Sequence, residues 1–102
     1  MILPSTNDYH ETEWKIGNVT YRVVVRDKIE DKSTVGLCDQ TRKIIYLVPW
    51  QGKFAGMQTF IHEILHAIEK EYNAKIPHDK LDSIAQGLCD FVLQNGFMDV
   101  SE

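Results

Sequence analysis

The sequence predicts an α+β domain in which a small antiparallel sheet of three or four strands is followed by two packed helices. Two observations predict this class. Short runs rich in β-branched and aromatic residues lie within residues 12–48, and runs with apolar residues at helical spacing lie within residues 54–94. A chain whose strands all precede its helices is typical of a fold with helices packed on one face of the sheet.

Length, composition and charge set the class of protein. We assign an N-terminal arm to residues 1–11, a single domain to 12–96 and a C-terminal tail to 97–102 of the 102 residues. The first residues lack the pattern of a secretory signal and no segment is apolar for long enough to cross a bilayer, so we expect a cytoplasmic protein that binds no membrane. The net charge of −4, with no basic stripe, argues against nucleic-acid binding.

The first expected hairpin has a two-residue turn. Residues 14–16 and 19–26 are β-rich runs separated by Gly17-Asn18, a pair that favours the tight turns of two-residue hairpins. Because side chains alternate between the faces of a strand, one face carries four apolar residues that we expect in the core. These residues are Val19, Tyr21, Val23 and Val25.

A second hairpin is expected after the charged segment 27–34, which we interpret as a solvated loop. Residues 35–38 and 43–48 are the two strands, and residues 39–42 are the turn between them. Pro49 ends the second strand because proline cannot donate a ladder hydrogen bond.

Two helices complete the expected fold. The first covers residues 54–72, the segment 73–77 interrupts the helical pattern, and the second covers 78–94 with Gly96 just beyond its end. The second helix is expected to turn an apolar stripe toward the first. This stripe is Leu81, Ala85, Leu88 and Val92.

The first helix carries the pattern His-Glu-x-x-His. His62 and His66 are four residues apart and therefore project from one helix face, where they can bind one Zn²⁺ ion. Glu63 lies beside them as a general base for water at the metal. The residues around this triplet are apolar on nearly every side, so two histidines and a glutamate would be buried at a cost of several kcal/mol unless they had partners. A metal ion removes that cost.

A zinc site that keeps one position open needs a third protein ligand, which we expect from the second helix because the short connection folds it back on the first. We favour His78, at the start of that helix. Asp82 is the alternative third ligand, or an outer carboxylate that holds His78 in the right tautomer, and Asp79 is a third choice.

The other residues of these types are given structural roles. His10 is expected to be exposed in the arm, and Cys38 and Cys89 form no Cys-x-x-Cys pair, so we interpret them as reduced, packed residues. Glu69 is expected on the solvated face of the first helix.

The tyrosines at positions 21, 46 and 72 are possible donors to an oxyanion, but tyrosines of strands and helices are more often core residues with wet hydroxyls.

Residues 35–95 resemble the zincin metallopeptidases, especially small bacterial and phage proteins related to the ImmA/IrrE and SprT-like groups. The resemblance implies a glycine-led hairpin (here 35–37 and 43–47), a helix with the motif 62–66, and a closing helix that brings the third ligand (here 81–88). The expected fold is therefore a minimal zincin-like domain.

The chain departs from these patterns at the third ligand. ImmA/IrrE-type proteins typically use a glutamate, and no glutamate lies between Lys75 and Val100. The metzincin pattern continues with a glycine and a third histidine, where this chain has Glu69 and Tyr72.

These residues predict a zinc-dependent metallopeptidase that hydrolyses peptide bonds of a peptide or protein substrate. The edge of the strand 43–48 is expected to pair with an extended substrate. The alternative is a catalytically weak or inactive zincin-fold module that binds a protein partner.

Overall fold

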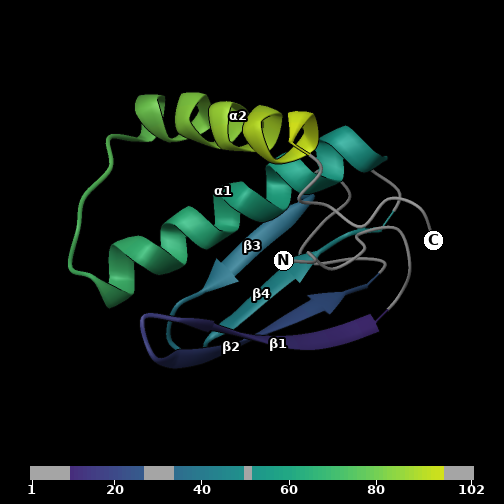
Figure 1. Cartoon of the computed structure of the whole chain (residues 1–102). Helices are drawn as coiled ribbons and strands as arrows, with labels where there is room; N and C mark the ends of the chain where they lie inside the picture. Colours follow the sequence, from purple (N-terminus) through teal and green to yellow (C-terminus); the bar gives the residue numbers. More distant parts are fainter. Residues whose placement is uncertain (1–9, 27–33, 50–51, 96–102) are drawn as a thin grey trace.

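Four strands precede two helices along the chain (Figure 1). The structure, a computed structural model, describes residues 10–26, 34–49 and 52–95. Most of the expected arm, most of the charged loop, the C-terminal tail and Gly96 lie outside the described residues. The elements are β1 (His10–Ile16), β2 (Val19–Val25), β3 (Gly36–Asp39), β4 (Ile44–Leu47), α1 (Lys53–Glu71) and α2 (His78–Gln94).

The predicted α+β class and the order of the elements are confirmed. β1 begins at His10, two residues before the expected start of the domain, and both helices lie within one residue of the expected bounds. Neither helix of the described part of the chain is long and apolar enough to cross a membrane.

The first hairpin has the predicted two-residue turn. Ile16 pairs with Val19, and Gly17 and Asn18 between them have φ angles of 58° and 69°. Both residues of a type I′ turn require positive φ, which glycine and asparagine adopt at the lowest cost. Tyr21, Val23 and Val25 lie in the core, where each is at most 3% exposed, as the alternation predicts. The fourth residue of the predicted face, Val19, is half-buried and packs against the core.

The sheet is mixed, so the expectation of an antiparallel sheet is wrong for one pair of strands. The strand order is β1-β2-β4-β3, and β2 pairs with β4 in parallel. β4 takes the inner position because three of its four side chains are buried, whereas the four residues of β3 are all half-buried. β3 is therefore the edge strand beside α1, and the strand 43–48 has no free edge for a substrate.

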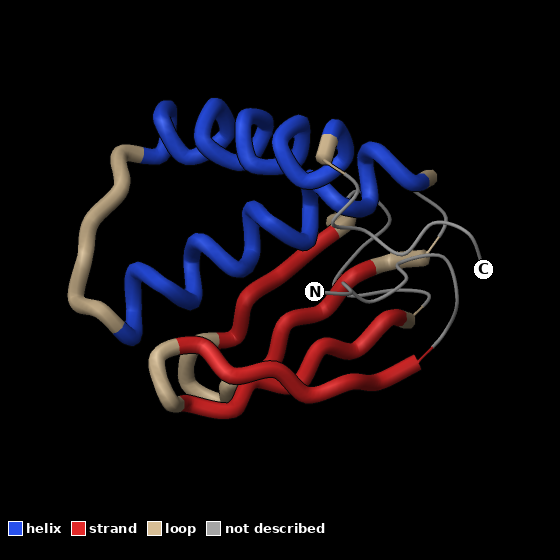
Figure 2. Tube along the Cα trace, viewed as in Figure 1, coloured by secondary structure: helices blue, strands red, loops and turns tan. Residues whose placement is uncertain are grey.

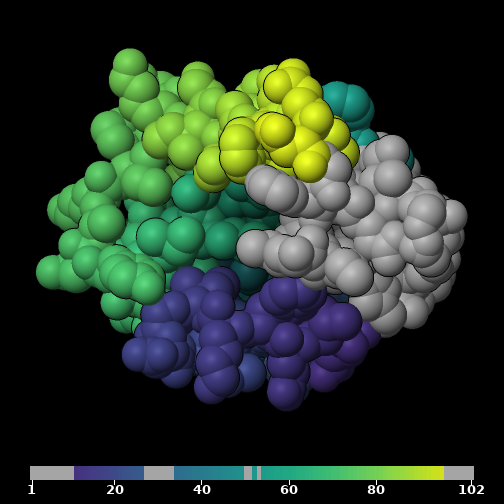
Figure 3. All heavy atoms as spheres, viewed as in Figure 1, coloured from purple at the N-terminus to yellow at the C-terminus, as the bar shows by residue number. Residues whose placement is uncertain are grey.

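The helices form layers on one face of the sheet, as the trace in Figure 2 shows. α1 packs against β3 and β4 on one side and against α2 on the other. In the space-filling view of Figure 3, atoms of α1 are visible between α2 and the N-terminal hairpin. α1 is thus the central layer, which places the middle of this helix within reach of both the edge strand and α2.

The buried side of α2 differs from the predicted stripe. Leu81, Ala85 and Cys89 are each 0% exposed, whereas Leu88 is 42% exposed. Residues spaced four apart follow one line along a helix, so the line 81, 85, 89 faces α1 and turns Leu88 outward. Cys89 is thereby a small core residue, as the sequence indicated.

Candidate metal centre

Three histidine rings from the two helices lie close together. His62 and His66 are one turn apart on α1, and His78 is the first residue of α2. The ring centroids of His62 and His66 are 4.9 Å apart, and the ring of His78 lies 6.0 and 6.2 Å from them. The fold therefore brings together the two histidines of the motif and the residue favoured as their third partner.

One of the three distances between the ring centres equals that of a tetrahedral zinc site, and the other two are longer. Two imidazoles that bind one zinc ion at about 2.0–2.1 Å have ring centres about 5 Å apart. The pair on α1 has this spacing, and the two distances to His78 are wider. Accordingly, no group of three or more His, Cys, Asp or Glu side chains within residues 10–26, 34–49 and 52–95 could hold a metal ion in this arrangement.

Carboxylates hold two of the three rings. The Nδ1 atom of His62 lies 2.9 Å from Asp82 Oδ1, and the Nδ1 atom of His66 lies 3.0 Å from Glu69 Oε1. A neutral imidazole whose Nδ1–H donates to a carboxylate has its lone pair on Nε2, which is the arrangement of histidines that bind metals. Burial, followed by the charge of His66, lowers the pKa of His62 and so favours the neutral ring.

Asp82 contacts a different histidine from the one that the sequence indicated. It was expected as the alternative third ligand or as the outer partner of His78, but its carboxylate bonds to His62. Asp82 lies one turn after His78 on α2 and faces α1, so its oxygen reaches the ring across the helix interface. Asp79, the third choice, is exposed in the first turn of α2.

Glu63 is an acidic side chain in the core and is 7% exposed. Burial raises its pKa to about 7, close to the value that suits a general base at neutral pH. Gly36 of β3 makes room for it, because a Cβ atom at this position would lie 3.0 Å from Glu63 Oε2 and 2.5 Å from Thr59 Cγ2. The edge strand thus passes directly over the carboxylate.

Two hollows open on either side of Glu63. One, of about 530 Å³, is lined by residues that include Gly36, Glu63, His62 and Asp82. The other, of about 340 Å³, also includes Gly36 and Glu63, together with His66 and Cys38. The carboxylate and the histidines of α1 are therefore reached from solvent along the edge strand.

Scans of protein-family models, curated proteins and solved structures found no match. The interpretation of the site therefore rests on the side chains and their geometry.

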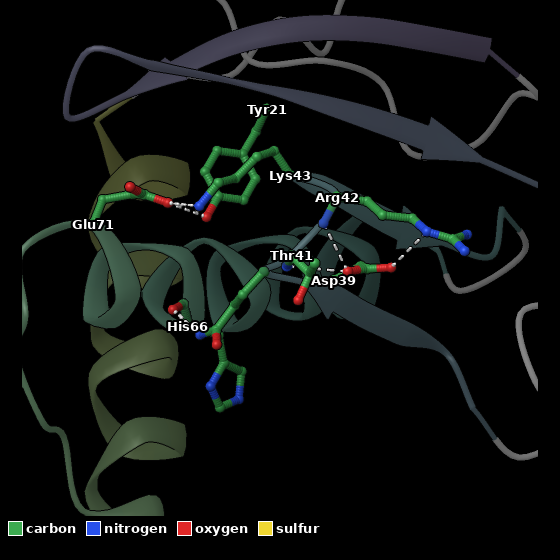
Figure 4. Close-up of polar contacts among 8 residues, drawn as sticks. Tyr21, Asp39, Thr41, Arg42, Lys43, His66 and Glu71 are labelled. Atoms are coloured by element: carbon green, nitrogen blue, oxygen red, sulfur yellow. Dashed lines mark hydrogen bonds and ion pairs between the residues drawn. The ribbon is translucent and has the colours of Figure 1, made fainter.

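The three tyrosines are engaged elsewhere. Figure 4 shows the Tyr21 hydroxyl and the Lys43 ammonium converging on the carboxylate of Glu71, at 2.7 and 2.6 Å. Tyr46 lies under the guanidinium of Arg26, 4.6 Å from the ring centroid. The ring of Tyr72 covers the hairpin turn, since a Cβ atom at position 17 would lie 2.9 Å from its Cε1 atom. These contacts give the tyrosines structural roles.

Three contacts at the site were not indicated by the sequence. Glu69 was expected on a solvated face, but its carboxylate faces His66 and accepts a hydrogen bond from the backbone N–H of Ile76 at 2.9 Å. The bond from Ile76 is the main cause of the lowered pKa of Glu69. Gln40, in the turn between β3 and β4, donates to the backbone carbonyl of His66 at 2.8 Å. The spacing of His66 and Glu69, three residues apart on a helix, is the signal that could have indicated the contact between these two side chains.

The two glycines at positions 36 and 87 are expected to respond oppositely to alanine. Gly36→Ala places a methyl group against Thr59 and Glu63, and such overpacking destabilises by about 1–3 kcal/mol. Gly87 lies in the exposed interior of α2, where a Cβ atom meets nothing within 4 Å, so Gly87→Ala should stabilise by about 0.5–1 kcal/mol. Urea unfolding of both variants measures the difference. Equal stabilities would show that β3 does not depend on the close approach at position 36.

Proposed function

We propose that the protein is a zinc-dependent metallopeptidase-like enzyme. The observation that carries this proposal is the grouping of three histidine rings, 4.9–6.2 Å apart, beside a buried carboxylate. Carboxylate partners on two of the rings add support, because histidines held in this way are typical of metal sites.

Zinc would be held by His62, His66 and His78. The donor set fits this metal, since neutral imidazoles are preferred zinc ligands and three of them leave one position open. Asp82 fits an outer role better than a ligand role because its oxygen already accepts from His62.

Glu63 is the group that moves protons. Zinc held by these residues would act as a Lewis acid that makes water acidic enough to react near neutral pH and polarises a carbonyl. Glu63 would accept the proton of the attacking water and return it to the departing amine.

An extended peptide is the substrate that suits the site. Within the described residues β3 is the last strand on its side of the sheet, so its outer edge could pair with an added strand, in place of the edge expected at 43–48. A peptide on this edge passes over Gly36 and Glu63, with the two hollows on either side to take its side chains. This places a backbone carbonyl beside the histidines.

Cleavage of unstructured peptides tests the proposal. The zinc-loaded protein is incubated with a peptide mixture and new termini are identified by mass spectrometry, with a chelator in one arm and zinc restored in another. We expect internal cleavage that disappears with the chelator and returns with zinc. A protein that binds zinc in a one-to-one ratio yet produces no new termini would instead be a zincin-fold binding module.

A further inference from the structure

Glu69 holds the connection between the helices as well as a histidine. Its Oε2 atom accepts from the backbone N–H of Ile76 at 2.9 Å, and its backbone carbonyl accepts from Ala74 N–H at 3.0 Å. Its Oε1 atom lies 3.0 Å from Nδ1 of His66. One residue therefore contacts a histidine of α1 and, through Ile76, the segment that leads directly into His78.

The start of α2 depends on this anchor. The N-cap residue Pro77 makes no side-chain capping bond, and its carbonyl accepts from Lys80 and Leu81 further along the helix. Upstream of the helix, the segment is fixed by Glu69 and by the packing of the Ile76 side chain against the core. These contacts fix the backbone that leads into His78.

A carboxylate is required because two donors converge on one side chain. The Ile76 N–H can only donate, and His66 must donate from Nδ1 if its Nε2 is to face a metal ion. Glutamate accepts both bonds, one on each oxygen. Glutamine has one accepting oxygen and would leave one of the two donors facing an NH₂ group.

We propose that Glu69 is a positioning residue that couples the two halves of the metal site. It sets the tautomer of His66 and anchors the connection 72–77 that carries His78, so zinc binding and closure of that connection stabilise each other. The proposal rests on the proposed zinc site. By thermodynamic linkage, the factor by which the closed connection favours zinc equals the factor by which zinc favours closure.

Asp82 provides the matched control. It bonds to Nδ1 of His62 as Glu69 bonds to His66, at 2.9 and 3.0 Å, but no bond to the connection is seen among the described residues. Asp82→Asn should therefore weaken zinc binding without releasing Ile76, whereas Glu69→Gln should change both.

The experiment combines zinc affinity with amide exchange in wild type, Glu69→Gln and Asp82→Asn. Zinc dissociation constants come from competition with a chromophoric chelator, and exchange of the Ile76 amide is followed by NMR with and without saturating zinc.

We expect both variants to bind zinc about 10–100-fold more weakly than the wild type. We expect zinc to slow Ile76 exchange about 10–100-fold in wild type and Asp82→Asn. In Glu69→Gln, zinc should fail to slow exchange of the Ile76 amide or should accelerate it. The reason is that zinc-bound His66 donates to the single accepting oxygen of the glutamine, which leaves the Ile76 N–H without an acceptor on this side chain.

The outcomes separate this proposal from the proposed function. Wild-type zinc affinity in Glu69→Gln, or Ile76 exchange that zinc slows equally in all three proteins, overturns the coupling and leaves the enzyme proposal standing. A wild type that binds no zinc overturns both. Zinc binding and coupling as expected, without peptide cleavage, supports the coupling and counts against the peptidase.

Discussion

Glu63→Gln is expected to lower kcat/KM for peptide cleavage by about 10²–10⁴-fold while zinc stays bound. Glutamine keeps the shape of the side chain under Gly36 but cannot accept the proton of the attacking water. Because Glu63 is not among the expected ligands, zinc content should not change. Steady-state kinetics and elemental analysis of the same preparation measure the two effects.

A carboxylate away from the hollows gives the control. Asp90→Asn removes a charge from α2 at a position that pairs with Gln86, so its kcat/KM should stay at the wild-type value. Undiminished cleavage by Glu63→Gln would contradict the assigned role of Glu63.

The same substitution should stabilise the metal-free protein at alkaline pH. Burial raises the pKa of Glu63 from 4.5 to about 7, so the folded state favours the protonated form. The stability that comes from protonated Glu63 is fully present below pH 4.5 and is lost as pH rises through 7. This loss lowers the free energy of unfolding by about 3 kcal/mol. Glutamine stays neutral at every pH, so the variant keeps this stability.

Urea unfolding in the presence of a chelator measures this effect at pH 5 and pH 8. We expect Glu63→Gln to exceed the wild type in stability at pH 8 by up to about 3 kcal/mol and to differ much less at pH 5. An identical difference at the two pH values would show that the carboxyl group does not titrate between them.

The strands and helices could be predicted because turn and helix preferences depend on residues that are close together in the sequence. The turn at Gly17-Asn18 and the helix bounds follow from backbone preferences and apolar spacing within a few residues. The parallel pairing of β2 with β4 was missed, because alternation along a strand says which face is buried and not which strand is its neighbour. The run Ile44-Ile45-Tyr46-Leu47 did contain a signal, since a nearly continuous apolar run is typical of an inner strand.

The site was predictable to the extent that it lies on one helix. The spacing of His62 and His66 places them on one face, and the buried Glu63 follows from its apolar neighbours. The partner of Asp82 depends on how α2 crosses α1, and the second bond of Glu69 depends on the path of the connection to Ile76. Neither is encoded in a spacing along the chain.

Metal content tests the central claim most directly. The protein is purified without added metal, and zinc per chain is determined by elemental analysis for the wild type and for His62→Ala, His66→Ala, His78→Ala and Asp82→Ala. Three histidine ligands predict one zinc ion per wild-type chain, loss of zinc in each histidine variant, and zinc retained with weaker affinity in Asp82→Ala. A folded wild type without zinc, or a His78→Ala protein that keeps its zinc while Asp82→Ala loses it, would contradict the three-histidine site.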